Sequence, residues 1–170
     1  MPVDGNGVAL EINLRAHMFE PASVHDYKIA GSQTQWGTGT AYGLNVYGTF
    51  TPISTTFYGC TMMNGSTIDL SGKTGAWSIQ SSIANAANNY GLTAAQQTAR
   101  KTVSFADNAT VKIKLGERKV KSGDKIVDWT GKTPANLATL RFTHADGEHF
   151  GLQKKDDGLY ITRGIMILVR

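Results

Sequence analysis

The sequence predicts an all-β protein of short stacked strands in a β-solenoid-like arrangement. Apolar and polar residues alternate with period two over short stretches, which is typical of half-buried strands. Turn residues interrupt these stretches every ~8–12 residues, and the 170 residues include 19 glycines. Because jelly-rolls and other β-sandwiches also consist of short strands separated by turn residues, those architectures are the alternative.

The first 41 residues are expected to form an irregular N-terminal segment with one edge strand. That strand is indicated by apolar residues at alternate positions, namely Val8, Leu10, Ile12 and Leu14. A shorter strand is expected at 25–29. The small polar residues of 31–40 predict a loop with Trp36 as its large side chain.

Residues 42–170 are expected to form a solenoid-like or sandwich domain with a polar insertion at about 81–100. The insertion has weak helical character, and Thr93 is its expected N-cap. Asp157 and Gly158 predict a hairpin turn. Strands are predicted within 44–47, 49–51, 55–61, 66–70, 76–80, 102–105, 111–115, 125–130, 140–144, 150–154 and 159–162.

Charge and hydropathy exclude several classes of protein. No apolar run approaches the ~18 residues of a membrane-spanning helix, and residues 1–7 lack the basic and apolar regions of a signal peptide. Residues 1–99 hold three basic and five acidic groups, a net charge of −2, whereas residues 100–170 hold fourteen and eight, a net charge of +6. Lysines on exposed strands also keep sheets soluble. Aromatic residues at base-stacking spacing are absent from this basic half, so no nucleic-acid partner is expected.

Few residues point to chemistry, and neither a catalytic site nor a cofactor is predicted. Cys60 is the single cysteine; it cannot form an internal disulfide and is expected in the core. His144, Asp146 and His149 are a candidate metal site because they flank a glycine turn, with a polar hairpin loop as the alternative. The sequence contains no phosphate loop, nucleophile elbow or dinucleotide fingerprint.

Aromatic residues of the first half provide a second candidate site. Exposed tryptophan and tyrosine can stack on sugar rings, because they combine an apolar face with a polar group. The alternative is that these residues are ordinary core aromatics. The candidate carbohydrate-binding residues are Trp36, Tyr42, Tyr47 and Trp77.

Three segments resemble a known family. Residues 64–72 (NGSTIDLSG) are similar to rungs of bacterial autotransporter-type passenger proteins, which are right-handed β-solenoids. Residues 109–116 (ATVKIKLG) and 122–129 (SGDKIVDW) resemble later and terminal rungs, with likeness to large surface proteins of gut Lentisphaerae and Verrucomicrobia. This resemblance implies a secreted or cell-surface location, the signal peptide having been removed, and a structural or adhesive role.

The two ends of the chain indicate self-association. An alternating strand near the N-terminus and an apolar run at 165–169 are the kind of edges that add to a neighbouring sheet. We therefore expect an exported structural or adhesive module that assembles with itself, with a filament as one outcome. A carbohydrate-binding module for a surface glycan is the alternative, followed by a polysaccharide-active enzyme. The expected self-association residues are Leu10, Ile12, Leu14, Ile165, Ile167 and Val169.

Overall fold

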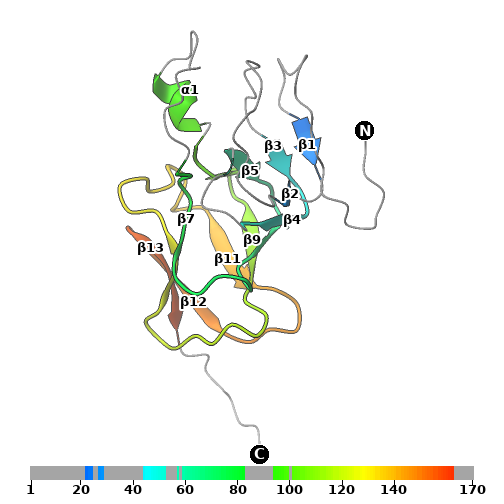
Figure 1. The fold of residues 1–170 in the computed structure, drawn as a ribbon, viewed down its shortest axis with the longest axis vertical. Coiled ribbons are helices and arrows are strands. Elements are labelled where there is room, and N and C mark those ends of the chain that lie inside the picture. The colour runs from blue at the N-terminus through cyan, green and yellow to red at the C-terminus, as the bar shows by residue number, and fades with distance from the viewer. Residues whose placement is uncertain are drawn as a thin grey trace, which may run out of the picture.

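The computed structural model describes residues 22–24, 27–28, 44–52, 57, 59–82, 94–99 and 101–162. Over these residues the chain forms thirteen strands and one six-residue helix, so the predicted all-β class is confirmed (Figure 1). In chain order the elements are β1 (Ala22–Val24), β2 (Tyr27–Lys28), β3 (Leu44–Val46), β4 (Thr49–Thr51), β5 (Cys60–Met62), β6 (Thr67–Asp69), β7 (Trp77–Ser78), α1 (Ala94–Ala99), β8 (Ser104–Phe105), β9 (Thr110–Lys114), β10 (Lys125–Asp128), β11 (Arg141–His144), β12 (Gly151–Lys155) and β13 (Gly158–Thr162).

The strands form three sheets, and the chain passes back and forth between them. Sheet A has the order β1-β3-β5-β8 and sheet B the order β2-β4-β6-β9-β11, and every pairing in both is parallel. In sheet C, ordered β7-β10-β13-β12, β7 and β10 are parallel and β13 is antiparallel to both of its neighbours. The all-β class holds for both expected architectures, the solenoid-like arrangement and the β-sandwich, and these pairings do not decide between them. The antiparallel hairpin of sheet C is a feature that solenoid ends and sandwiches share.

The register of each sheet stacks buried side chains in columns. In sheet B, Phe50 pairs with Ile68 and Ile68 with Ile113, and all three are fully buried. In sheet A, Val46 pairs with Met62 and Met62 with Phe105. The alternation of each strand therefore matches its neighbours, because a shift of one residue would turn every apolar side chain outward.

The core lies between the sheets and is rich in aromatic rings. The rings of Phe50, Phe57 and Trp77 lie within 6 Å of one another, centroid to centroid. Nearer the C-terminal strands, Trp129 is 1% exposed and stacks on Phe142 at 6.0 Å. The Nε1 group of Trp129 donates a hydrogen bond to the Lys155 carbonyl, which attaches the β12–β13 hairpin to the core.

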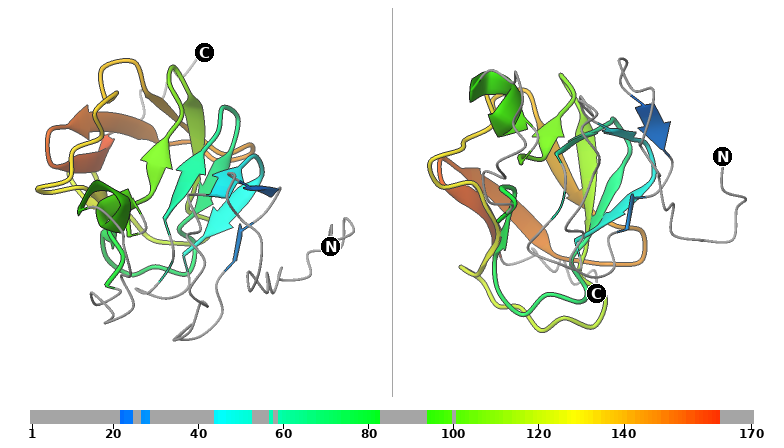
Figure 2. Two further views of the ribbon diagram at one scale, coloured as in Figure 1. Left: turned by 90° about the horizontal axis from the view of Figure 1, so that it is seen from above. Right: turned by 45° about the horizontal axis from the view of Figure 1, so that its top comes forward.

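The last strands cover part of the end of the stack. In Figure 1 the β12–β13 hairpin lies on the flank opposite β1 and β2, and the views of Figure 2 agree. The loop before β11 covers the edge of β8, since the Asn136 amide donates to the carbonyls of Phe105 and Ala106. Lys154 in turn donates to the carbonyls of Leu137 and Leu140 in that loop.

Two of the differences between the structure and the sequence expectations concern β1 and the last hairpin. β1 lies in a segment where no strand is predicted, and the hairpin turn is shifted by one residue. Lys155 pairs with Gly158, so the two turn residues are Asp156 and Asp157 and Gly158 begins β13. The terminal segments that carry the expected self-association residues lie outside the described residues, as does Thr93.

Candidate functional site

A hollow of about 450 Å³ lies among the described residues, at a place where several strands end. Three parts of the chain form it: the 115–124 loop between β9 and β10, the 145–150 loop between β11 and β12, and the end of β13. Its apolar wall consists of Leu115, Val120, Phe150 and Ile161, and its polar side chains include Arg118, Ser122, Glu148 and His149. We call it the loop-end hollow.

Glu148 fixes the two loops of the loop-end hollow to each other. Its carboxylate accepts hydrogen bonds from the backbone N–H groups of Leu115, at 2.9 Å, and Gly116, at 2.6 Å. Gly116 has a positive φ of 56°, a backbone conformation that glycine adopts without strain. Glu148 is therefore engaged by the backbone, and its role in the hollow is to hold the shape of one wall.

Arg118 supplies the cationic group of the loop-end hollow. Its Nη2 donates to the Gly75 carbonyl at 3.0 Å, which connects the 115–124 loop to the loop after β6. Nη1 is buried and has no hydrogen-bond partner in the part of the chain that the structure describes. Burial lowers the pKa of Arg118, and the charge of Asp124 acts in the opposite direction with a smaller effect. No carboxylate of the described residues forms an ion pair with Arg118.

The predicted metal site is not assembled. The rings of His144 and His149 face each other edge to face at 5.7 Å between centroids. Asp146, however, has a side chain 92% exposed and forms an ion pair with Lys112 at 3.1 Å. Among the described residues no group of three or more His, Cys, Asp or Glu side chains is placed to hold a metal ion. The expectation of a metal at His144, Asp146 and His149 is therefore wrong, because Lys112 on the neighbouring strand takes the carboxylate.

The predicted aromatic surface is also only partly present. Trp77 is 5% exposed and packs against Phe50 and Phe57, so its face is not available to a sugar ring. Its assignment to carbohydrate binding is wrong, because the period-two alternation of its strand turns it into the core. Tyr47 is 50% exposed. Trp36 and Tyr42 lie outside the described residues.

Cys60 lies in the core, as predicted, at the start of β5. The side chain is buried, and desolvation by burial raises the pKa of the thiol above its ordinary value. A thiol with a raised pKa is a poor nucleophile and metal ligand at neutral pH, because the thiolate is the reactive form. Cys60 is therefore a packing residue.

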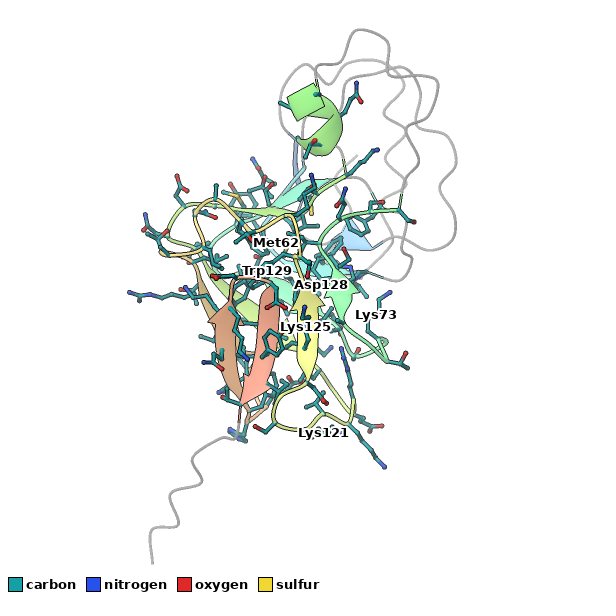
Figure 3. All side chains as sticks on the ribbon, turned by 90° about the vertical axis from the view of Figure 1, so that its left-hand side faces the viewer. Met62, Lys73, Lys121, Lys125, Asp128 and Trp129 are labelled. Carbon is teal, nitrogen blue, oxygen red and sulfur yellow. The ribbon has the colours of Figure 1, made fainter. Side chains whose placement is uncertain are left out.

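A second polar cluster lies on the outer face of sheet C, where Figure 3 shows Lys125 and Asp128 together on β10. Lys125 Nζ lies 2.6 Å from Asp157 Oδ2 and 3.3 Å from Asp128 Oδ1, and the Tyr160 hydroxyl donates to Asp157 at 2.8 Å. The hydrogen bond from Lys125 lowers the pKa of Asp157, while the same contact raises the pKa of Lys125. The Lys155 ammonium lies 4.2 Å from the centre of the Tyr160 ring. Because every charge in this Lys125 cluster has a partner, the cluster connects the hairpin to β10 and leaves no open position for a ligand.

Sequence reasoning missed the loop-end hollow. Its residues are spread over 115–162, and Arg118 lies in a loop whose amino-acid sequence contains no recognisable motif. The available signal was weak: glycines at 116 and 147 mark the two turns that bring the walls together. Charge alone did not separate Arg118 from the neighbouring Lys119 and Lys121, which are exposed.

Comparison of the chain with protein-family models, curated proteins and solved structures finds no match. In the described residues no helix is both long enough and apolar enough to cross a membrane.

Proposed function

We propose that the protein is an exported structural or adhesive module of a bacterial surface that associates with itself through its terminal strands. The observation that carries this proposal is the parallel, in-register stacking of sheets A and B. A parallel sheet of this kind grows by adding one more strand in the same register, and its outermost strands offer unpaired backbone groups to a neighbour. The surface location rests on the resemblance of the rung segments to passenger proteins.

The outermost strands of the described sheets indicate which ends of two copies would meet. Within the described residues, β2 and β11 are the outermost strands of sheet B, at opposite ends of the stack. At the β11 end, the Asn136 amide bonds to the edge of sheet A, and β12 lies against β11 of sheet B. Contact between two different ends of identical chains is heterologous, and it continues into an open polymer unless the rotation closes a ring.

The apolar run at 165–169 begins three residues after the end of β13, a strand of sheet C, and is the segment to test first. Side chains of a strand alternate between its two faces, so Ile165, Ile167 and Val169 would share one face, with Met166 and Leu168 on the other. We expect the triple change Ile165→Ser, Ile167→Ser, Val169→Ser, or deletion of 165–170, to reduce the assembly to smaller species. Light scattering after size exclusion measures this, with electron microscopy of any large species.

The matched control is the double change Met166→Ser, Leu168→Ser, which alters the same run on the opposite face and should have the smaller effect. Fluorescence of the buried Trp77 and Trp129 checks that each variant is folded. The corresponding N-terminal variant replaces Leu10, Ile12 and Leu14 by serine. A wild-type monomer, or an assembly unchanged by both sets of substitutions, would contradict the proposal.

A further inference from the structure

We propose that the loop-end hollow binds an organic carboxylate of about the size of one sugar ring, such as a uronic acid, with the carboxylate paired to Arg118. The hollow of about 450 Å³ is within the usual range for small-ligand sites, which combine apolar walls with a few convergent polar groups. This inference goes beyond self-association and rests on different residues.

The unpaired donor of Arg118 selects a ligand with an acceptor group, whereas the charges of Arg118 and Glu148 offset each other in the lining. Arg118 is the cation of the lining, and the carboxylate of Glu148 is already held by two backbone N–H groups. Arg118 Nη1 is a buried donor without an acceptor among the described residues. A guanidinium pairs with a carboxylate through charge-assisted hydrogen bonds, so this ligand supplies the acceptor that Nη1 lacks once the side chain has turned.

The walls select an organic ligand over a simple inorganic anion. Phe150 and Val120 are half-buried and offer apolar surface in the same lining as Arg118. Ser122 and His149 are exposed on the rim and can bond hydroxyl groups. A uronic acid combines these features, because its ring has apolar faces, hydroxyl groups and one carboxylate.

Binding requires a small rearrangement at Arg118. Nη1 is buried, so a ligand reaches it after the guanidinium rotates about its last torsion angles. Nη2 has one hydrogen bond to protein, to the Gly75 carbonyl, and this is the contact that the rotation changes. Glu148 keeps both loops in place during this change, since it bonds to the backbone and not to Arg118.

The test is a titration of the full chain, ¹⁵N-labelled, with sodium glucuronate, glucose and sodium chloride at matched ionic strength. We expect saturable shifts of the amides at 115–118 and 147–150 with glucuronate, and none with the other two. An oligosaccharide of uronic acids is titrated in the same way. Tighter binding of the oligosaccharide indicates a polysaccharide source, and equal affinity per site indicates the free acid.

Two variants locate the carboxylate. Arg118→Gln should weaken binding at least tenfold, whereas Lys119→Gln, which removes the same charge from the next residue, should leave it within twofold. Arg118→Lys keeps the positive charge but lacks the planar guanidinium, so it should give intermediate affinity. This variant also serves as the test if Arg118→Gln does not fold. Equal losses at Arg118 and Lys119, shifts with chloride, or binding only after deletion of 163–170 would each overturn the proposal.

Discussion

Gly59 lies where two parts of the chain pass too close for any side chain. A Cβ atom at this position would lie 1.8 Å from the Ala99 carbonyl oxygen at the end of α1 and 2.8 Å from that of Thr102. Both neighbours are backbone atoms, so neither can turn aside as the end of a flexible side chain would. This single glycine therefore allows the α1 end of the 81–100 region to approach sheet A.

We expect Gly59→Ala to destabilise the protein by about 1–3 kcal/mol, because overpacking forces the backbone to shift. Gly72→Ala is the matched control, since a Cβ at Gly72 meets nothing within 4 Å. Urea unfolding followed by tryptophan fluorescence measures both. Equal unfolding midpoints for the two variants would show that the backbone near Ala99 can shift without a loss of stability.

Gly158 shows why the hairpin turn was predicted one residue late. The pair Asp157 and Gly158 is a common turn sequence, which favours those two residues at the centre of the turn. In the structure Gly158 begins β13, and a Cβ there would lie 2.5 Å from the Val127 carbonyl oxygen. This glycine is required for a close approach between strands, and a contact 31 residues away in sequence leaves no local signal.

At the scale of elements, the Lys125 cluster connects the β12–β13 hairpin to β10. The pKa of Asp157 is lowered from 3.8 first by the hydrogen bond from Lys125 and then by that from Tyr160. A lowered carboxyl pKa stabilises the fold above the unfolded pKa, and this stability is lost as the pH falls through the folded pKa. The raised pKa of Lys125 stabilises the fold at lower pH, and this stability is lost only as the pH rises beyond 10.5.

We expect Asp157→Asn to lower the urea midpoint at pH 7 and to have progressively less effect as the pH falls below 3.8, where the wild-type carboxyl also becomes neutral. Asp156→Asn is the control, because Asp156 is the neighbouring turn residue and forms no ion pair among the described residues. Unfolding curves from pH 2.5 to 7 give the comparison. A difference between wild type and Asp157→Asn that stays constant over this range would contradict the proposed role.

The loop before β11 protects the edge of sheet A through one side chain. Asn136 Nδ2 donates to the Phe105 carbonyl at 2.9 Å and also contacts Ala106 and Asp107. We expect Asn136→Ala to cost about 0.5–1.5 kcal/mol, the usual net contribution of a hydrogen bond, because these hydrogen bonds are only partly buried. Hydrogen exchange should become faster at β8 in this variant and stay unchanged in Ala135→Ser, at an exposed position of the same loop. Unchanged exchange at β8 in Asn136→Ala would show that the edge is protected by other contacts.

For the whole molecule, sequence patterns predicted the strands better than the places where they meet. Val111, Ile113 and Leu115 alternate with lysines, and the structure buries all three of these apolar residues, because alternation depends only on the pleat of the strand. Asp146 and Arg118 illustrate the limit. The surroundings of each depend on a strand or loop from another pass of the chain, which the local sequence does not reveal.

Because each strand of sheet B is hydrogen-bonded only to its neighbours in the stack, stability should vary along the sheet. β9 pairs with β6 on one side and β11 on the other, whereas β2 pairs with β4 alone among the described strands. We expect amide hydrogen exchange to be slowest in β6 and β9 and faster in β2. Ile113, fully buried in β9, stacks in register on Ile68 of β6.

Ile113→Ala should cost about 2–5 kcal/mol and accelerate exchange most in β6, β9 and β11, with the effect declining toward β2. Lys114→Ala is the control from the same strand, since it removes an exposed lysine whose ion pair with Asp69 contributes about 0–1 kcal/mol. If Ile113→Ala accelerates all strands of sheet B equally, the stack unfolds as one cooperative unit. Additional strands from a second copy would then add stability to the whole sheet and not only to its edge.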